Sequence, residues 1–354
     1  MPFLISTHIM EKTKKEPYAL LLNDLHVDKN TVGEFSLNWD EALDICNDRS
    51  IRRIIVGGDL WTNRAAQTLP VLLTVYRALS SAVKIEGFKV ILAEGNHDLV
   101  DQEDTYGYSH LFGLHNSIIA VDDFDIYAIS DELLLVVMSY FPENGSFLER
   151  LDEVRERVDP AKTILYIHEG VSGAISTSSD KELPASAFKG FRKVLVGHYH
   201  DRAQVGDNIF YIGASRQHNF GEDEEKGYTI LYTDGSTEFV KNQVNTRYRT
   251  LTCTPEQLDR TMEKVRELTE EDVKVRLQIE CQSEESANID RKALLEMGVS
   301  KVEVKAQDAT VESASQAIET RYDKDGIKKE YRDFCEKKEI TDVEIGMIYL
   351  DKIN

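Results

Sequence analysis

The sequence predicts an α/β protein with a layered sheet core. Between residues 18 and about 240, short apolar runs rich in β-branched residues alternate with helical patterns, which is typical of layered α/β folds. The clearest predicted strands span residues 18–22, 53–56, 89–93, 163–167 and 193–196. A polar cluster comes directly after each of these five strands in the sequence. Because the ligand crevice of an open α/β sheet lies beyond the carboxyl ends of its strands, we expect the clusters to converge into one site.

The intervening and following segments complete this prediction. Helical patterns cover residues 38–46, 69–79 and 147–158, and further strand patterns cover 118–121, 125–129 and 133–138. After residue 241 the predicted order is helix 255–268, strand 273–279, helix 290–296 and strand 302–304. Three parts are therefore expected: a main domain at 1–245, a small α/β domain at 246–308, and a charged tail at 309–354 with a helix at 327–338.

Composition limits the function classes. The chain of 354 residues has 41% apolar and 30% charged residues, and no apolar run reaches the length of about 18 residues that a membrane span needs. The four cysteines are far apart and form no CxxC pair, as expected of reduced thiols. No signal peptide is recognisable. We therefore expect a cytoplasmic protein without membrane association, in the host cytoplasm if the source is viral.

The formal net charge of -21 opposes nonspecific binding to nucleic acid, which depends on Lys and Arg neutralising phosphates. Bound divalent cations, a local basic stripe or a partner protein could offset an acidic surface elsewhere. Net charge alone therefore does not exclude DNA as a substrate.

The first two polar clusters contain residues that bind metals. Asp24 and His26 lie two residues apart at a strand end, so both side chains can reach one ion. Asp59 follows Gly57 and Gly58, where glycine allows close approach of the backbone, and one carboxylate can bridge two cations. Either motif alone is a weak signal, because a Gly-Asp pair is more often just a turn.

The later clusters are more specific. Asn96, His97 and Asp98 combine an amide oxygen for a cation, an imidazole, and a carboxylate that could orient it. His198 and His200 repeat the spacing of two residues. A single histidine is more often a packed or exposed residue than a ligand. Five clusters in order, each at a strand end, favour a metal site.

As a set, these motifs resemble those of the calcineurin-like metallophosphoesterases. The matching segments are Asp24-Leu25-His26, Gly58-Asp59, Gly95-Asn96-His97-Asp98, His168 and Gly197-His198-Tyr199-His200. The resemblance implies a β-sandwich flanked by helices. It assigns Asp24, His26 and His200 to one ion, Asn96, His168 and His198 to the other, Asp59 to both, and leaves His97 for catalysis.

Within that superfamily the chain looks most like SbcD-type nucleases of break repair and phage recombination. Residues 210–215, 219–222 and 226–228 resemble the family's segment after its GHxH motif, and 273–304 its capping domain. This resemblance implies a DNA nuclease with 3′-to-5′ exonuclease and single-strand endonuclease activity, two divalent ions that are most often Mn²⁺, a homodimer, and an SbcC-type coiled-coil ATPase partner. Two positions depart from it, since Asp28 replaces a glycine and Thr62 a histidine linked to exonuclease action.

The expected chemistry is metal-assisted hydrolysis. A water activated between two cations about 3.5 to 4 Å apart would attack phosphorus in line. His97 would protonate the leaving oxygen or stabilise its charge. Asp98 would either fix the His97 ring or cap a helix. Imidazole, carboxylate and amide ligands without thiolate suit manganese or iron, with zinc as a further option.

Two other functions compete with the nuclease. A phosphatase or phosphodiesterase for small phosphoesters could use the same scaffold, although Gly58-Asp59-Leu60-Trp61-Thr62-Asn63-Arg64 differs from the GDxVDRG motif of protein phosphatases. A noncatalytic binding subunit would not need the full metal set with His97. The tail at 309–354 could dock the ATPase or pack on its own domain.

Overall fold

The computed structural model describes residues 15–101, 106–142, 146–174 and 182–307, and ten separate positions between 328 and 350. The chain divides into two compact units, Met1–Arg249 with Asp272–Lys274, and Thr250–Glu271 with Val275–Asn354. Most of the predicted tail at 309–354, including half of the residues of its predicted helix at 327–338, lies outside the described residues.

The first unit contains two six-stranded sheets. In the first sheet, of order β12-β11-β1-β2-β3-β4, the last four strands run parallel, and β11 is antiparallel to both β1 and β12. Its strands are β1 (Pro17–Leu22), β2 (Arg53–Gly57), β3 (Lys89–Ala93), β4 (Ile118–Ala120), β11 (Gly227–Tyr232) and β12 (Thr237–Lys241).

The second sheet has the order β5-β6-β7-β8-β10-β9, with a parallel centre from β6 to β10 and an antiparallel strand at each edge. Its strands are β5 (Phe124–Ala128), β6 (Leu134–Met138), β7 (Thr163–His168), β8 (Lys193–Gly197), β9 (Ala203–Val205) and β10 (Ile209–Tyr211). Both sheets are therefore mixed.

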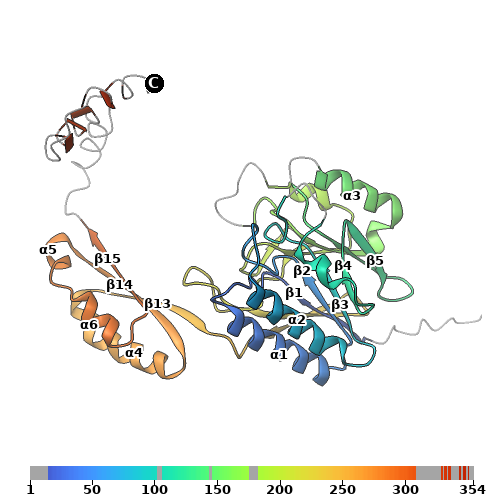
Figure 1. Cartoon of the computed structure of the whole chain (residues 1–354), viewed down its shortest axis with the longest axis horizontal. Coiled ribbons are helices and arrows are strands. Elements are labelled where there is room, and N and C mark those ends of the chain that lie inside the picture. Colours follow the sequence, from blue (N-terminus) through green and yellow to red (C-terminus); the bar gives the residue numbers. More distant parts are fainter. Residues whose placement is uncertain are drawn as a thin grey trace, which may run out of the picture. The chain divides into compact units, whose positions relative to one another are not determined.

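Helices cover the outer faces of the two sheets (Figure 1). The first sheet packs on α1 (Val32–Asp48) and α2 (Leu69–Val83), and the second on α3 (Ser146–Arg157). A separate cluster of buried apolar residues, including Leu21, Ile91 and Leu135, fills the space between the sheets. Since alternate residues of a strand point to opposite faces, each central strand contributes to two layers of core. The predicted class, a layered α/β sandwich flanked by helices, is confirmed.

Short 3₁₀ helices connect some of these elements, namely η1 (Tyr108–Phe112), η2 (Pro160–Lys162) and η3 (Ala185–Phe188). The main strands begin and end within two residues of their predicted bounds. Helix α1 is longer than predicted and begins at Val32 instead of residue 38. Phe35, Trp39, Ala42 and Cys46 form a buried apolar stripe along this helix. Polar residues between them obscure the helical periodicity in the sequence.

The second unit is a small α/β fold. It has a three-stranded sheet of order β13-β14-β15. Its elements are β13 (Arg247–Cys253), η4 (Pro255–Gln257), α4 (Leu258–Glu270), β14 (Val273–Gln282), α5 (Ser283–Ser286), α6 (Arg291–Glu296) and β15 (Lys301–Gln307). The first residues of β13 and β14, up to Arg249 and Lys274, belong to the first unit. Every second residue of β14, from Val273 to Cys281, is buried, as its alternating sequence predicts. Strand β13, which the sequence did not predict, lacks this alternation.

In the described parts of the chain, no helix is both long and apolar enough to cross a bilayer.

Strand register places the polar clusters at one edge of each sheet. Leu22 pairs with Val56, Gly57 with Ala93, and His168 with Gly197, so neighbouring parallel strands end at the same level. The residues that follow these ends are thereby brought together across the sequence.

Candidate metal centre

The strand-end loops surround one cavity of about 480 Å³ in the first unit. Six of the predicted site residues line it: His26, Asp59, Asn96, His97, His198 and His200. Asp24 and His168, two further predicted ligands, are fully buried with 0% exposure. The fold thus gathers all seven predicted ligands in one region.

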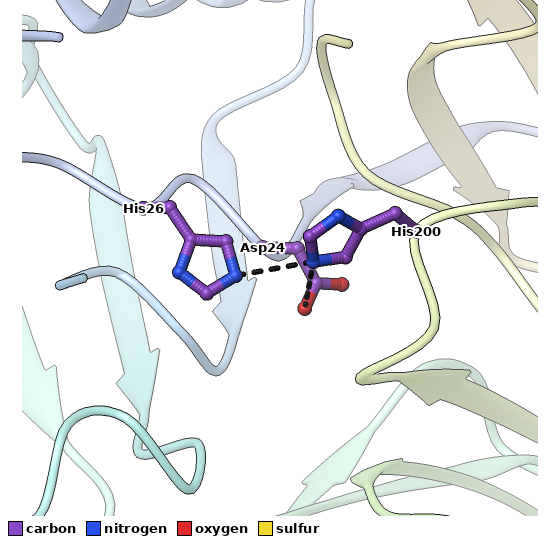
Figure 2. Close-up of side chains that lie close together, drawn as sticks. All are labelled: Asp24, His26 and His200. Carbon is purple, nitrogen blue, oxygen red and sulfur yellow. Dashed lines mark hydrogen bonds and ion pairs between the residues drawn. The ribbon is translucent and has the colours of Figure 1, made fainter. Parts of the chain in front are cut away.

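Asp24, His26 and His200 form a first group whose ligand atoms all lie within 4.8 Å of one another (Figure 2). The Nε2 atoms of the two histidines are 3.1 Å apart, and His200 Nε2 is 3.9 Å from Asp24 Oδ1. Figure 2 shows the two rings and the carboxylate facing a common point. Such an arrangement of two imidazoles and one carboxylate can hold a divalent cation.

Asp24, Asp59 and His168 form a second group of the same kind. His168 Nε2 lies 3.3 Å from Asp59 Oδ2 and 3.9 Å from Asp24 Oδ1. Asp59 Oδ2 also lies 3.6 Å from Nε2 of His26, a residue of the first group. Both carboxylates therefore stand between the two groups, whereas the resemblance gave the bridging position to Asp59 alone.

Asn96 and His198 add two more donor atoms. The amide oxygen Oδ1 of Asn96 is 3.2 Å from Nδ1 of His198. Burial lowers the pKa of His198 to about 4, and burial likewise lowers the pKa of His26 to about 4. Both rings are thus neutral at pH 7, which is the form that binds a metal.

The two carboxylates divide their oxygens between support and binding. Asp24 Oδ2 accepts hydrogen bonds from the backbone N–H of His198 at 3.2 Å and from Asn23 Nδ2 at 2.5 Å. Asp59 Oδ1 accepts the backbone N–H of His97 at 2.8 Å. Each carboxylate is therefore fixed through one oxygen, and the other oxygen faces the histidines.

Two buried ligand atoms lack hydrogen-bond partners. Asp24 Oδ1 and His168 Nε2 are inaccessible to solvent, and within the described residues neither makes a hydrogen bond. A buried polar atom left unsatisfied costs about 1–3 kcal/mol. A cation between these atoms would satisfy both, so the residues fit a divalent-metal site.

The charges of His168 and Asp59 also indicate a cation site. Burial opposes the proton on His168, but Asp59 and Asp24 raise its pKa to about 10. Burial opposes ionisation of Asp59, but His168 and His26 hold the pKa of that carboxyl below its ordinary value. In the metal-free protein the two residues form an ion pair, and a metal cation would replace the proton between them.

His97 has its ring fixed by the backbone. Its Nδ1 is 3.0 Å from the carbonyl oxygen of Thr62, and its ring meets that of His26 edge-on at 5.1 Å between centroids. Thr62, which stands where a histidine was expected, thus positions His97 through its main chain.

Asp98 neither fixes the His97 ring nor caps a helix, the two roles predicted for it. Its Oδ1 accepts the N–H of Trp61 at 2.9 Å, and its Oδ2 accepts the N–H of Gly95 at 2.6 Å. It therefore ties the loop after β2 to the loop after β3. No helix begins at Asp98, and no contact to the His97 ring is found among the described residues, so Asp98 orients the loop that carries His97.

Asp28, the other departure, caps a turn. Its Oδ1 accepts the backbone N–H groups of Asn30 at 2.7 Å and Thr31 at 2.9 Å. This Asx-type turn precedes α1. An aspartate can thus take the place of a glycine here without disturbing the ligand loop.

Three residues near the ligands were not predicted as part of the site: Arg216, His218 and Glu222. Arg216 and His218 line the cavity, and Glu222 Oε1 is 2.8 Å from His200 Nδ1. Arg216 and His218 lie between two stretches that resembled the SbcD-type nucleases, 210–215 and 219–222. Glu222 ends the second stretch, and its place in that motif was the signal that could have identified it.

No profile of a known protein family matches the sequence. The chain is 23% identical over 213 residues to the "Putative phosphoesterase 078R" of Invertebrate iridescent virus 3. The alignment covers 58% of this chain and 59% of the viral protein, so it spans less than two thirds of that relative.

Two solved structures are also similar. The Pseudomonas putida nuclease MPE is 15% identical, with 61% of this chain and 84% of that chain covered and a TM-score of 0.30. A dimetal phosphatase from Danio rerio is 13% identical, with 60% and 91% covered and a TM-score of 0.40.

Proposed function

We propose that this chain is a two-metal phosphoesterase that cleaves phosphodiester bonds of DNA. The observation that carries the proposal is the convergence of Asp24, Asp59 and four histidines around one cavity, with one carboxylate oxygen and one ring nitrogen left without a hydrogen-bond partner among the described residues. The similarity to a viral protein named as a phosphoesterase supports the same chemistry.

Two divalent cations bound here would supply Lewis acidity and an activated water for attack on phosphorus. The protein residues do the positioning. Asp24 and Asp59 each keep one oxygen for the cations, and their other oxygens are held by hydrogen bonds from the His198 and His97 backbones. The ligand geometry is thus set before a substrate enters.

His97 is the proposed proton donor. A carbonyl only accepts hydrogen bonds, so His97 Nδ1 carries the proton shared with Thr62. The Nε2 atom then delivers a proton to the leaving oxygen when the ring is an imidazolium. The cavity is lined by this ring and by four of the candidate metal ligands on other loops, so a scissile phosphate would meet both.

The finer assignment extends the motif resemblance. We propose a nuclease with 3′-to-5′ exonuclease and single-strand endonuclease activity, Mn²⁺ as the metal, an SbcC-type ATPase as partner, and a homodimer as the working form. Mixed imidazole, carboxylate and amide donors without thiolate suit manganese or iron, with zinc as a further option, and the motif resemblance favours manganese.

The test is Mn²⁺-dependent digestion of end-labelled single- and double-stranded DNA by the purified chain, with a small phosphodiester and a small phosphomonoester alongside. His97→Ala should lower the cleavage rate by about 10²–10⁴-fold, as loss of a general acid does. His115→Ala is the matched control, because His115 is exposed and outside the cavity.

Turnover of the monoester without DNA cleavage would replace the nuclease with a small-substrate phosphatase. Absence of hydrolysis on all substrates, with and without the ATPase partner, would refute the enzymatic proposal and leave a binding subunit.

A further inference from the structure

The loop that joins β10 to β11 contacts two members of the first ligand group through their main chains. Arg216 Nη2 donates to the carbonyl oxygen of His26 at 3.3 Å, and His218 Nε2 donates to the carbonyl oxygen of Asp24 at 2.8 Å. Arg216 is only 3% exposed, so its contact is made away from solvent. These two side chains hold the backbone that presents Asp24 and His26.

The same loop contacts the third member, His200, through a carboxylate. Glu222 Oε1 lies 2.8 Å from His200 Nδ1, and the Glu222 side chain is 8% exposed. Three side chains of one loop therefore each support a different member of the group. These contacts join residues that lie 22 to 194 positions apart in the sequence.

Glu222 is itself held firmly. Its Oε2 accepts the backbone N–H of His218 at 3.0 Å, and its Oε1 also accepts Asn219 Nδ2 at 2.9 Å. With His200, the carboxylate has three donors. A neutral glutamine cannot satisfy all three, because one of its two terminal atoms is itself a donor.

The consequence for His200 is a fixed tautomer. With Nδ1–H donating to Glu222, the lone pair of Nε2 is directed toward the other ligand atoms, His26 Nε2 at 3.1 Å and Asp24 Oδ1 at 3.9 Å. A carboxylate behind a metal-binding histidine fixes the orientation of the ring and makes it a stronger ligand.

The second ligand group has a different support. His168 Nδ1 is 3.0 Å from the carbonyl oxygen of Gly57, at the end of β2. Its tautomer is set by a strand end in the sheet core, with no carboxylate involved. His200 and His168 are thus oriented by separate parts of the fold, although the two groups share Asp24.

We propose that Glu222 is a positioning residue that sets the metal affinity of the Asp24–His26–His200 group separately from that of the group containing His168. This inference rests on the proposed two-metal function. It adds that the metal affinity of only one of the two sites depends on Glu222. Loss of the Glu222 carboxylate weakens the binding of one ion and leaves the binding of the other unchanged.

The test is calorimetric titration of the metal-free full-length chain with Mn²⁺, at fixed pH and ionic strength. In Glu222→Gln, one of two binding events should weaken by about 10–100-fold, the usual effect of losing such a supporting carboxylate. The other should remain within about threefold of wild type. Glu225→Gln is the matched control, since Glu225 pairs with Lys241 at the surface. The Glu225→Gln protein should bind both ions with wild-type affinity.

A second variant separates positioning from loop folding. Asn219→Ala removes the Asn219 contacts to Glu222 and to the N–H of Gly221, but leaves the Glu222–His200 hydrogen bond. A purely structural role for Glu222 would make Asn219→Ala as damaging to metal affinity as Glu222→Gln, and that result would overturn the proposal.

A third comparison tests whether Glu222 acts through His200. In a His200→Asn background, Glu222→Gln should cause no further loss of affinity, because interacting residues are non-additive. Equal loss in both backgrounds, or wild-type titration by Glu222→Gln alone, would refute the inference. Failure of the wild-type chain to bind Mn²⁺ would instead refute the proposed function on which the inference depends.

Discussion

Four candidate ligands have backbones in the left-handed region. The φ angles are 53° for Asp24, 44° for His26, 53° for Asp59 and 88° for His198. In the described chain, only two other non-glycine residues have a positive φ. Such conformations cost about 1–3 kcal/mol each and persist where the surroundings enforce them. The ligand loops therefore lower stability in the metal-free protein, and bound cations would recover part of this loss.

Gly95 shows how tightly these loops are packed. A Cβ at Gly95 would overlap both the backbone nitrogen and Oδ1 of Asp59. We expect Gly95→Ala to lower the free energy of unfolding by about 1–3 kcal/mol, as overpacking does, and to weaken Mn²⁺ binding by displacing Asp59. Urea unfolding with and without Mn²⁺ measures both effects. Gly33→Ala is the control, because its Cβ would meet no atom within 4 Å; equal behaviour of the two variants would show that the Gly95 contact is unimportant.

At the scale of elements, η1 is attached to the first sheet by a charged cluster. His110 Nδ1 lies 3.3 Å from Oε1 of Glu94, which follows β3, and His110 Nε2 lies 2.6 Å from Oδ1 of Asp122, which follows β4. Glu94 is fully buried and also accepts a hydrogen bond from the Ser109 hydroxyl. Hydrogen bonds to Glu94 and then Asp122 raise the pKa of His110 to about 9, although burial opposes this.

This attachment should make stability depend on pH. Because the folded pKa of His110, about 9, exceeds its ordinary 6.5, the folded state holds the proton more tightly than the unfolded state. The stabilisation is complete below pH 6.5 and disappears as the pH rises through 9. We expect the urea midpoint of the metal-free wild type to fall over this window more than that of His110→Gln. His115→Gln should follow the wild type, and an identical pH profile for His110→Gln would contradict the expectation.

At the scale of the whole molecule, local patterns in the sequence were enough to predict strands β1 to β8 of the two large sheets, but not strands β9 to β12 or the contacts between loops. The strand ends before Asp24, Asp59 and His168 were visible because apolar runs stop at polar residues. The support of His200 by Glu222 was not, because it depends on how the loop between two strands packs. The left-handed backbone of His198 likewise has no local signal, since only tertiary contacts enforce it.

The net charge of -21 leads to an expectation about DNA binding by the isolated chain. A protein that neutralises six to ten phosphates with Lys and Arg loses about 10³–10⁵ in affinity between about 50 and 200 mM salt. Here Asp and Glu number 63 against 42 Lys and Arg, so attraction at the site should come mainly from bound cations. We therefore expect the affinity to fall by less than about tenfold over this salt range.

Fluorescence anisotropy with a labelled phosphorothioate duplex, in Ca²⁺ to slow cleavage, measures this dependence. Removing the divalent ion with a chelator should weaken binding at every salt concentration, because the acidic surface then repels DNA without compensation. A steep salt dependence that survives chelation would contradict this account and would reveal a basic DNA-binding surface that operates without the metal centre.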